Sequence, residues 1–182
     1  MYELKIADSE FYDERTEEFV LVKGKTLQLE HSLVSISKWE SKWHRAFLSD
    51  KQMTMEELRD YIRCMTITQN VDPTLYLAVN NTQIKEIMDY INTPQTATHV
   101  NRLTDNKQQR SKDVVTSELI YYWMVSLEID IKCEKWHLSR LLALIDICNA
   151  KNSPPKKMNK RDILSRNAAI NAARRKATGS TG

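Results

Sequence analysis

Glycine and proline are scarce in this sequence, with 3 Gly and 4 Pro among 182 residues. An all-β fold needs many turn residues, so this scarcity argues against one and favours helices. A chain with three glycines also lacks the glycine-rich loop whose backbone amides cradle a phosphate. No apolar run approaches the about 18 residues that cross a membrane, and no secretion signal is recognised. We therefore expect no contact with a membrane.

Cysteine is sparse too: the three residues are an odd number and form no C-x-x-C pair. They predict no disulfide framework and fit a reducing cytoplasm. A metal site could be drawn from Cys133 and His137, which stand four apart on one helix face, with Cys148 as a third ligand. Structural zinc sites usually show two close-spaced ligand pairs, so buried thiols and a packed histidine are favoured over a metal.

Catalytic signatures are missing as well. The chain has no G-x-S-x-G elbow, no H-E-x-x-H helix and no P-loop. Nucleophilic catalysis needs a base and an orienting group around a serine or cysteine, and no such arrangement is recognised. We therefore expect a protein that is not an enzyme and has no cofactor.

What the sequence does contain is typical of a mainly α protein with a compact helical bundle. Hydrophobic residues make up 41% and charged residues 28%, enough for a real core. Residues 1–29 are β-rich and predict a small hairpin with Gly24 in its turn. A two-stranded unit is marginal alone, so this segment should pack on the helical body, residues 30–152. Residues 153–182 are expected to form a basic C-terminal helix and tail.

Several helices of the body carry their own start signals. Ser32 is a plausible N-cap, and Thr54 with Glu57 forms a capping box. The segment 114–129 is apolar almost all round, which predicts a helix central to the core. A further amphipathic helix is predicted to turn four side chains inward: Ile84, Ile87, Met88 and Ile91. Residues 92–113 are polar and predict a long exposed loop.

The segment 29–49 holds two of the four tryptophans. On a helical wheel Trp39, Trp43 and Phe47 share one face with Leu33 and Ile36. Such a stripe is most often core. Because tryptophan is also favoured where one side is apolar and the other wet, we expect part of this stripe to be open to a partner.

The C-terminal segment is strongly basic. From Lys151 onward nine Lys and Arg face one acid, a net charge of +8, so the preceding residues carry −5 of the chain's overall +3. Seven of these basic residues are candidate partner contacts: Lys156, Lys157, Lys160, Arg161, Arg174, Arg175 and Lys176. They could neutralise nucleic-acid phosphates, but no aromatic residue offers base stacking, and an acidic protein partner explains the charge as well.

Five segments in order resemble one group of phage proteins: "LEHSLVSISKWESKWHRAFL", "ELRDYIRCM", "TSELIYYWM", "KWHLSRLLALI" and "PPKKMNKRDILSRNAAINAARRKA". Over residues 27–178 the chain looks like a tail assembly chaperone of long-tailed bacteriophages. The resemblance implies a small, mostly helical, non-enzymatic protein of the host cytoplasm. Such chaperones coat the tape-measure protein, recruit tail-tube subunits and leave before the virion is complete.

Alternatives remain open at this stage. The strong charge of the C-terminal segment is not required of such a chaperone. It favours, as the second interpretation, a structural virion protein at the head–tail junction or in the capsid. A nucleic-acid-binding packaging factor is the third, and a homo-oligomer is compatible with each of them.

Overall fold

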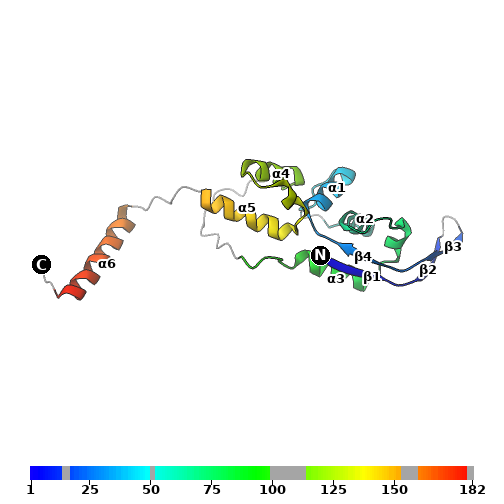
Figure 1. The fold of residues 1–182 in the computed structure, drawn as a ribbon, viewed down its shortest axis with the longest axis horizontal. Coiled ribbons are helices and arrows are strands. Elements are labelled where there is room, and N and C mark those ends of the chain that lie inside the picture. Colours follow the sequence, from blue (N-terminus) through cyan, green and yellow to red (C-terminus); the bar gives the residue numbers. More distant parts are fainter. Residues whose placement is uncertain (14–16, 50–51, 99–113, 153–159, 180–182) are drawn as a thin grey trace. The chain divides into compact units, whose positions relative to one another are not determined.

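The computed structural model describes residues 1–13, 17–49, 52–98, 114–152 and 160–179. It is mainly α, as predicted, with a small β element at the N-terminal end (Figure 1). The chain divides into two units, Met1–Ala150 and Lys151–Gly182, which are treated separately below.

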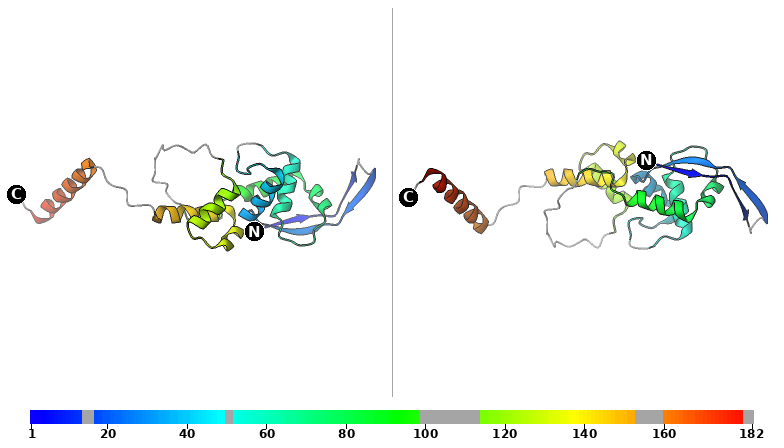
Figure 2. Two further views of the ribbon diagram at one scale, coloured as in Figure 1. Left: turned by 90° about the horizontal axis from the view of Figure 1, so that it is seen from above. Right: turned by 90° about the horizontal axis from the view of Figure 1, so that it is seen from below.

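The β element is a two-stranded antiparallel ribbon in two sections. Its inner section pairs β1, Tyr2–Ile6, with β4, Lys25–Leu29. Its outer section pairs β2, Ser9–Asp13, with β3, Glu18–Val22. The two sections share one register, since Ile6 faces Lys25 and Ser9 faces Val22. Figures 1 and 2 show the outer section extending beyond the helices of its unit.

Gly24 does not lie in the hairpin turn, which corrects the prediction. It lies between β3 and β4, beside the backbone of residues 6–8 that joins β1 to β2. A Cβ on Gly24 would meet the Ile6 carbonyl oxygen at 2.4 Å, and its backbone N–H donates to Asp8 Oδ1 at 2.6 Å. Only glycine fits this contact, so the residue permits the break between the two sections of the ribbon.

The first helices begin where their caps predict. Helix α1 is Leu33–Trp43 with Ser32 as N-cap, and α2 is Met55–Met65 with the capping box of Thr54 and Glu57. The 3-10 helix η1, Pro73–Ala78, and helix α3, Asn81–Asn92, follow. The inward face of α3 is narrower than predicted: Ile87 is buried, whereas Met88 is 38% exposed.

Helix α1 ends at Trp43, earlier than the apolar stripe suggests. His44 adopts a left-handed conformation with φ of 49° and donates its backbone N–H to the Glu40 carbonyl oxygen at 2.8 Å. The chain then turns back, and Glu40 Oε1 accepts the backbone N–H of Phe47 at 2.8 Å. Phe47 therefore reaches the aromatic cluster from a loop and not from the helix.

Helix α4, Ser117–Ser126, lies at the periphery of the body and is not central to it. Only Ser117, Ile120 and Met124 are buried, while Tyr122 is 66% and Val125 73% exposed. The prediction of a central helix from the apolar segment 114–129 was therefore wrong. The 3-10 helix η2, Ile131–Lys135, and helix α5, Leu138–Asn152, complete the body.

The core joins the inner ribbon to the helices. Side chains alternate along β1 and β4, so that Leu4, Leu27 and Leu29 are buried against the helices. Helix α3 packs against the first residue of β1, where the ring of Tyr2 stacks on that of Tyr90 with 5.4 Å between ring centroids. The inner section of the ribbon is thus part of the core, as the marginal stability of an isolated hairpin requires.

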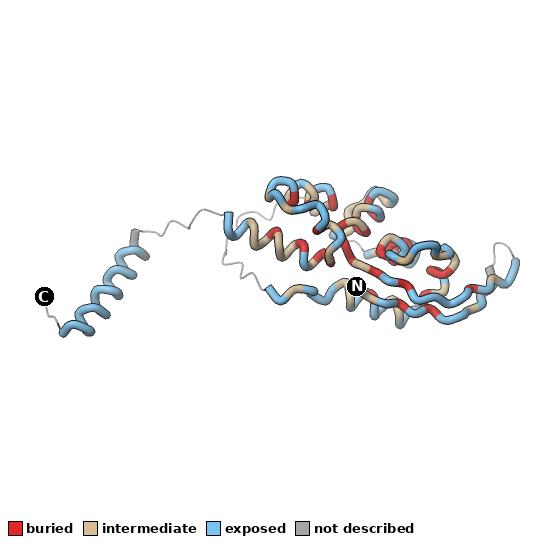
Figure 3. The backbone as a smooth tube through the Cα atoms, in the orientation of Figure 1, coloured by how far each residue is buried: buried red, intermediate tan, exposed pale blue. Residues whose placement is uncertain are grey.

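The second unit contains helix α6, Lys160–Thr178. Every residue of α6 whose burial is described is exposed, as its uniform colour in Figure 3 shows. Most of the expected loop, residues 99–113, and the first part of the expected basic segment, residues 153–159, lie outside the described residues.

Candidate functional site

The aromatic stripe of α1 forms part of the core. Trp39 is 0% exposed, and its Nε1 donates to the Glu57 carbonyl oxygen at 3.0 Å. Phe47 packs edge-on against Trp39 with 5.4 Å between centroids and lies 4.1 Å from the ring of Tyr61. Trp39 therefore offers no surface to a partner, and its role is to join α1 to α2.

Trp43 is partly buried and directs its polar edge inward. Its Nε1 donates to Asp60 Oδ2 at 2.8 Å, and the other oxygen of Asp60 pairs with Lys42 and Arg63, each at 2.8 Å. Burial raises the pKa of the Asp60 carboxyl, but hydrogen bonds from Lys42, Trp43 and Arg63 outweigh it and hold the pKa below its usual value. Asp60 is therefore a fully satisfied charge that organises the surface around it.

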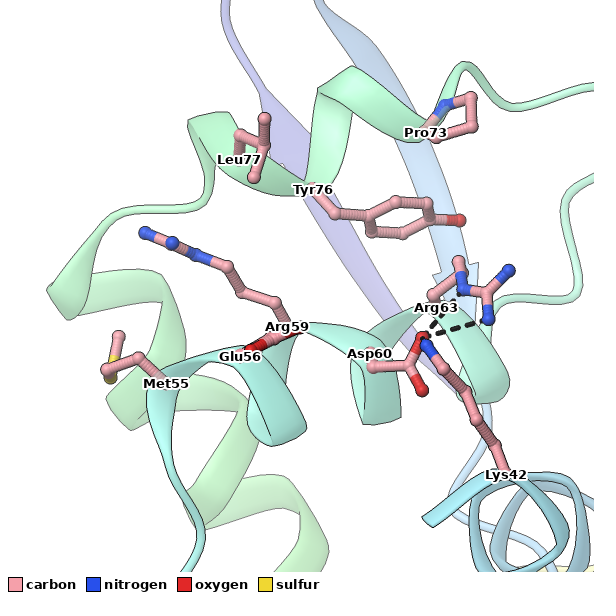
Figure 4. Close-up of a pocket in the computed structure, with 9 residues that line it drawn as sticks. All are labelled: Lys42, Met55, Glu56, Arg59, Asp60, Arg63, Pro73, Tyr76 and Leu77. Carbon is pink, nitrogen blue, oxygen red and sulfur yellow. Dashed lines mark hydrogen bonds and ion pairs between the residues drawn. The ribbon is translucent and has the colours of Figure 1, made fainter. Parts of the chain in front are cut away.

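A pocket of about 470 Å³ lies beside this carboxylate, between α2 and η1 (Figure 4). Lys42 closes one end from α1, and Arg59 extends along the floor beneath Leu77. The lining combines cationic and apolar side chains on the same short helices. The sequence analysis did not identify this pocket, because its lining comes from α1, α2 and η1, which only the fold brings together.

Two histidines are buried side by side next to the core. His31 precedes α1 and His137 precedes α5; they are 4% and 5% exposed, with 5.1 Å between ring centroids. His31 Nδ1 shares a hydrogen bond with the Tyr61 hydroxyl, and His137 Nδ1 shares one with Ser139 Oγ at 2.8 Å. Burial, with the nearby His137, lowers the pKa of His31 to about 3. Burial also lowers the pKa of His137.

The residues considered for a metal have other roles. His137 packs edge-on against Tyr90, with 5.1 Å between centroids. Cys133 is a buried free thiol in η2 and Cys148 a partly buried one in α5. Within the described ranges no three His, Cys, Asp or Glu side chains gather closely enough to hold a metal ion.

The largest apolar exposure on the β element is on its outer section. Tyr12 and Phe19 face each other across β2 and β3 with 5.2 Å between ring centroids, and Leu21 follows on the same face of β3. Their exposed fractions are 50%, 70% and 76%. We call Tyr12, Phe19 and Leu21 the ribbon face. Sequence reasoning predicted the strands but did not single out these residues, because it placed the partner surface on the tryptophan stripe.

The basic residues predicted in the C-terminal segment are only partly described. Arg161, Arg174, Arg175 and Lys176 are exposed on α6. Lys156 and Lys157 lie outside the described residues, and Lys160 is described only as the first residue of the helix. The helix therefore presents a cationic surface of its own.

Comparisons add no relative. No family model, curated protein or solved structure matches this chain significantly. A search of the described helices finds none that is both long and apolar enough to cross a membrane.

Proposed function

We propose that this chain is a non-enzymatic tail assembly chaperone of a long-tailed bacteriophage. In this role it binds the tape-measure protein and recruits tail-tube subunits in the host cytoplasm. Residues 30–152 serve as a compact helical bundle that supports the ribbon, and residues 153–182 as a basic appendage. The proposal draws on the resemblance over residues 27–178 and is carried in the structure by the exposed ribbon face.

The ribbon face fits a partner that presents apolar side chains. Exposed apolar patches of this kind mark interaction surfaces, since leaving them in water is unfavourable. Covering a leucine or phenylalanine fully is worth about 1.5–3 kcal/mol, so Phe19 and Leu21 alone offer several kcal/mol to a partner. The apolar side of a long helix, such as the tape-measure protein presents, can lie along these side chains. We therefore move the proposed surface from the buried Trp39 to the ribbon face.

Helix α6 supplies a different kind of contact. Arg161, Arg174, Arg175 and Lys176 are exposed, so their attraction to an acidic surface weakens as the Debye length falls from about 10 Å at 0.1 M salt to about 3 Å at 1 M. Apolar burial is scarcely screened by salt. In the proposal the ribbon face holds the tape-measure protein, and α6 attracts the tail-tube protein.

Co-expression with a tape-measure protein and a tail-tube protein tests this division. The double substitution Phe19→Ser and Leu21→Ser should abolish co-purification with the tape-measure protein at both 0.1 and 1 M salt. Tyr122→Ser is the matched control, because it removes an exposed apolar side chain from α4 and should leave the complex intact. Changing Arg174, Arg175 and Lys176 to Ala should spare that complex and weaken recruitment of the tube protein. Retention of the tape-measure protein by the ribbon variant would contradict the proposal.

The exposed basic helix favours a second candidate, a structural virion protein at the head–tail junction or in the capsid that touches DNA or a neighbouring subunit. Mass spectrometry of purified virions separates the two, since a chaperone should be missing and a structural protein present in stoichiometric amount. If DNA is the only partner retained, elutes steeply with salt and depends on the three basic residues of α6, a packaging or virion role replaces the chaperone.

A further inference from the structure

We propose that the pocket between α2 and η1 binds a carboxylate side chain, flanked by an apolar residue, in an acidic segment of a protein partner. The pocket shares no lining residue with the ribbon face, and the proposal does not depend on the role in tail assembly. It is built on Arg59, on its two neighbouring cations and on the apolar walls around them.

Among the three cations of the pocket, Arg59 is the one without an ion pair to a described residue. Lys42 and Arg63 are both occupied by Asp60, at 2.8 Å each. Arg59, by contrast, forms no ion pair with any described residue, and its Nε is buried without a hydrogen-bond acceptor. A buried donor left without an acceptor is unfavourable, and more so when it is charged. A carboxylate brought by a ligand would give this guanidinium the ion-pair partner that it lacks among the described residues.

The charge balance of the pocket points to a ligand with a single negative charge. Three cationic side chains line it against two carboxylates, Glu56 and Asp60, which leaves one positive charge in excess. One carboxylate matches this excess, whereas a phosphate monoester carries about 1.5 to 2 negative charges at neutral pH. The planar fork of Arg59 also suits the two oxygens of a carboxylate.

The walls of the pocket favour a peptide over a small free acid. Met55 and Leu77 are 46% and 51% exposed and stand at the same end as Arg59, and the ring of Tyr76 lies between Arg59 and Arg63 (Figure 4). A volume of about 470 Å³ is larger than a carboxylate needs. An acidic residue next to an apolar one would place its charge on Arg59 and its neighbour against Met55 and Leu77.

The test uses the full chain and two short acetylated peptides, one of alternating Leu and Glu and one of alternating Leu and Gln, followed by amide NMR shifts. The Glu peptide should shift amides of α2 and η1, including that of Arg59. The Gln peptide should bind about tenfold more weakly, the effect expected for loss of a hydrogen bond to a charged group. Inorganic phosphate is the third probe and should shift these amides less than the Glu peptide.

Arg59→Gln should weaken binding of the Glu peptide at α2 and η1 by about tenfold, while Lys132→Gln, which removes one exposed positive charge from η2, should leave those shifts unchanged. Arg59→Lys keeps the charge but not the planar fork, so its affinity for the Glu peptide should fall between those of the wild type and Arg59→Gln. This variant also provides the test if Arg59→Gln does not fold. The proposal is overturned by equal binding of both peptides, by shifts confined to α6, by stronger binding of phosphate, or by unchanged binding in the Arg59 variants.

Discussion

Lowering the pH from 7.5 to 5.5 should destabilise the folded chain through His31. An imidazole in the unfolded chain titrates near 6.5, whereas burial lowers the pKa of His31 in the folded chain to about 3. The unfolded state therefore binds the proton first. The contribution of His31 to stability is complete above about pH 6.5 and is lost progressively as the pH falls toward 3.

The magnitude follows from the tenfold excess of protonated over neutral imidazole in the unfolded chain one pH unit below its pKa. At pH 5.5 this costs the folded state about 1.4 kcal/mol, and each further unit costs about the same again. The lowered pKa of His137 acts in the same direction. Asp60, whose folded pKa is also lowered, adds its own loss only as the pH falls below about 5, so the interval from 7.5 to 5.5 reports mainly on histidine.

Denaturant unfolding followed by circular dichroism at the two pH values measures this effect. In His31→Gln the drop in unfolding free energy between pH 7.5 and 5.5 should be smaller than in the wild type by about 1.4 kcal/mol. His44→Asn is the control, because it removes an exposed imidazole at a left-handed position that asparagine tolerates. If the wild type and His31→Gln lose the same free energy, the reasoning about the buried histidine pair is refuted.

Four further predictions concern other parts of the chain. Gly24→Ala should lower the free energy of unfolding by about 1–3 kcal/mol, an amount typical of overpacking, because its Cβ would meet backbone at 2.4 Å. Calorimetry should show this loss as a lower transition temperature. Trp43→Phe leaves Asp60 with one donor fewer and should cost about 1–3 kcal/mol in denaturant unfolding; an unchanged midpoint would show that the bond is not formed in solution. A chain ending at Asn152 should keep its thermal transition within a few degrees, since the exposed α6 contributes little apolar burial, and loss of cooperative unfolding would contradict this. The purified protein should carry no stoichiometric zinc by elemental analysis, and Cys133→Ser should fold normally; one zinc per chain, lost in that variant, would overturn the interpretation.

Features set by neighbouring residues could be read from the sequence. The N-caps Ser32 and Thr54 are confirmed because each bonds to an amide three residues away. The end of α1 could not be predicted in this way. Glu40 accepts the amide of Phe47 through one oxygen and that of Ser117 through the other, at 2.8 Å each. The second contact spans 77 residues, and no local pattern contains it.

The candidate sites show the same limit. An apolar pattern indicates that a side chain is favoured in the core, but it does not show whether another part of the chain will cover that side chain. Trp39 is covered by α2, whereas Phe19 and Leu21 stay exposed on the outer section of the ribbon, where no described segment covers them. The sequence therefore predicted a partner surface on the tryptophan stripe, although other parts of the chain cover much of it. The pocket at Arg59 depends on η1, which lies more than ten residues further along the chain.

The single register of the ribbon restricts how its length can vary in related chains. Every facing pair, from Tyr2 with Leu29 to Asp13 with Glu18, has residue numbers with the same sum. Inserting one residue into only one strand would turn every later side chain of that strand over, exposing Leu4 or Leu27 and burying Phe19 or Leu21. Natural length variation should therefore be found at the outer end, between Asp13 and Glu18, or as matched insertions in both strands. The outer section of the ribbon could then become longer or shorter while the inner section keeps the same leucines in the core.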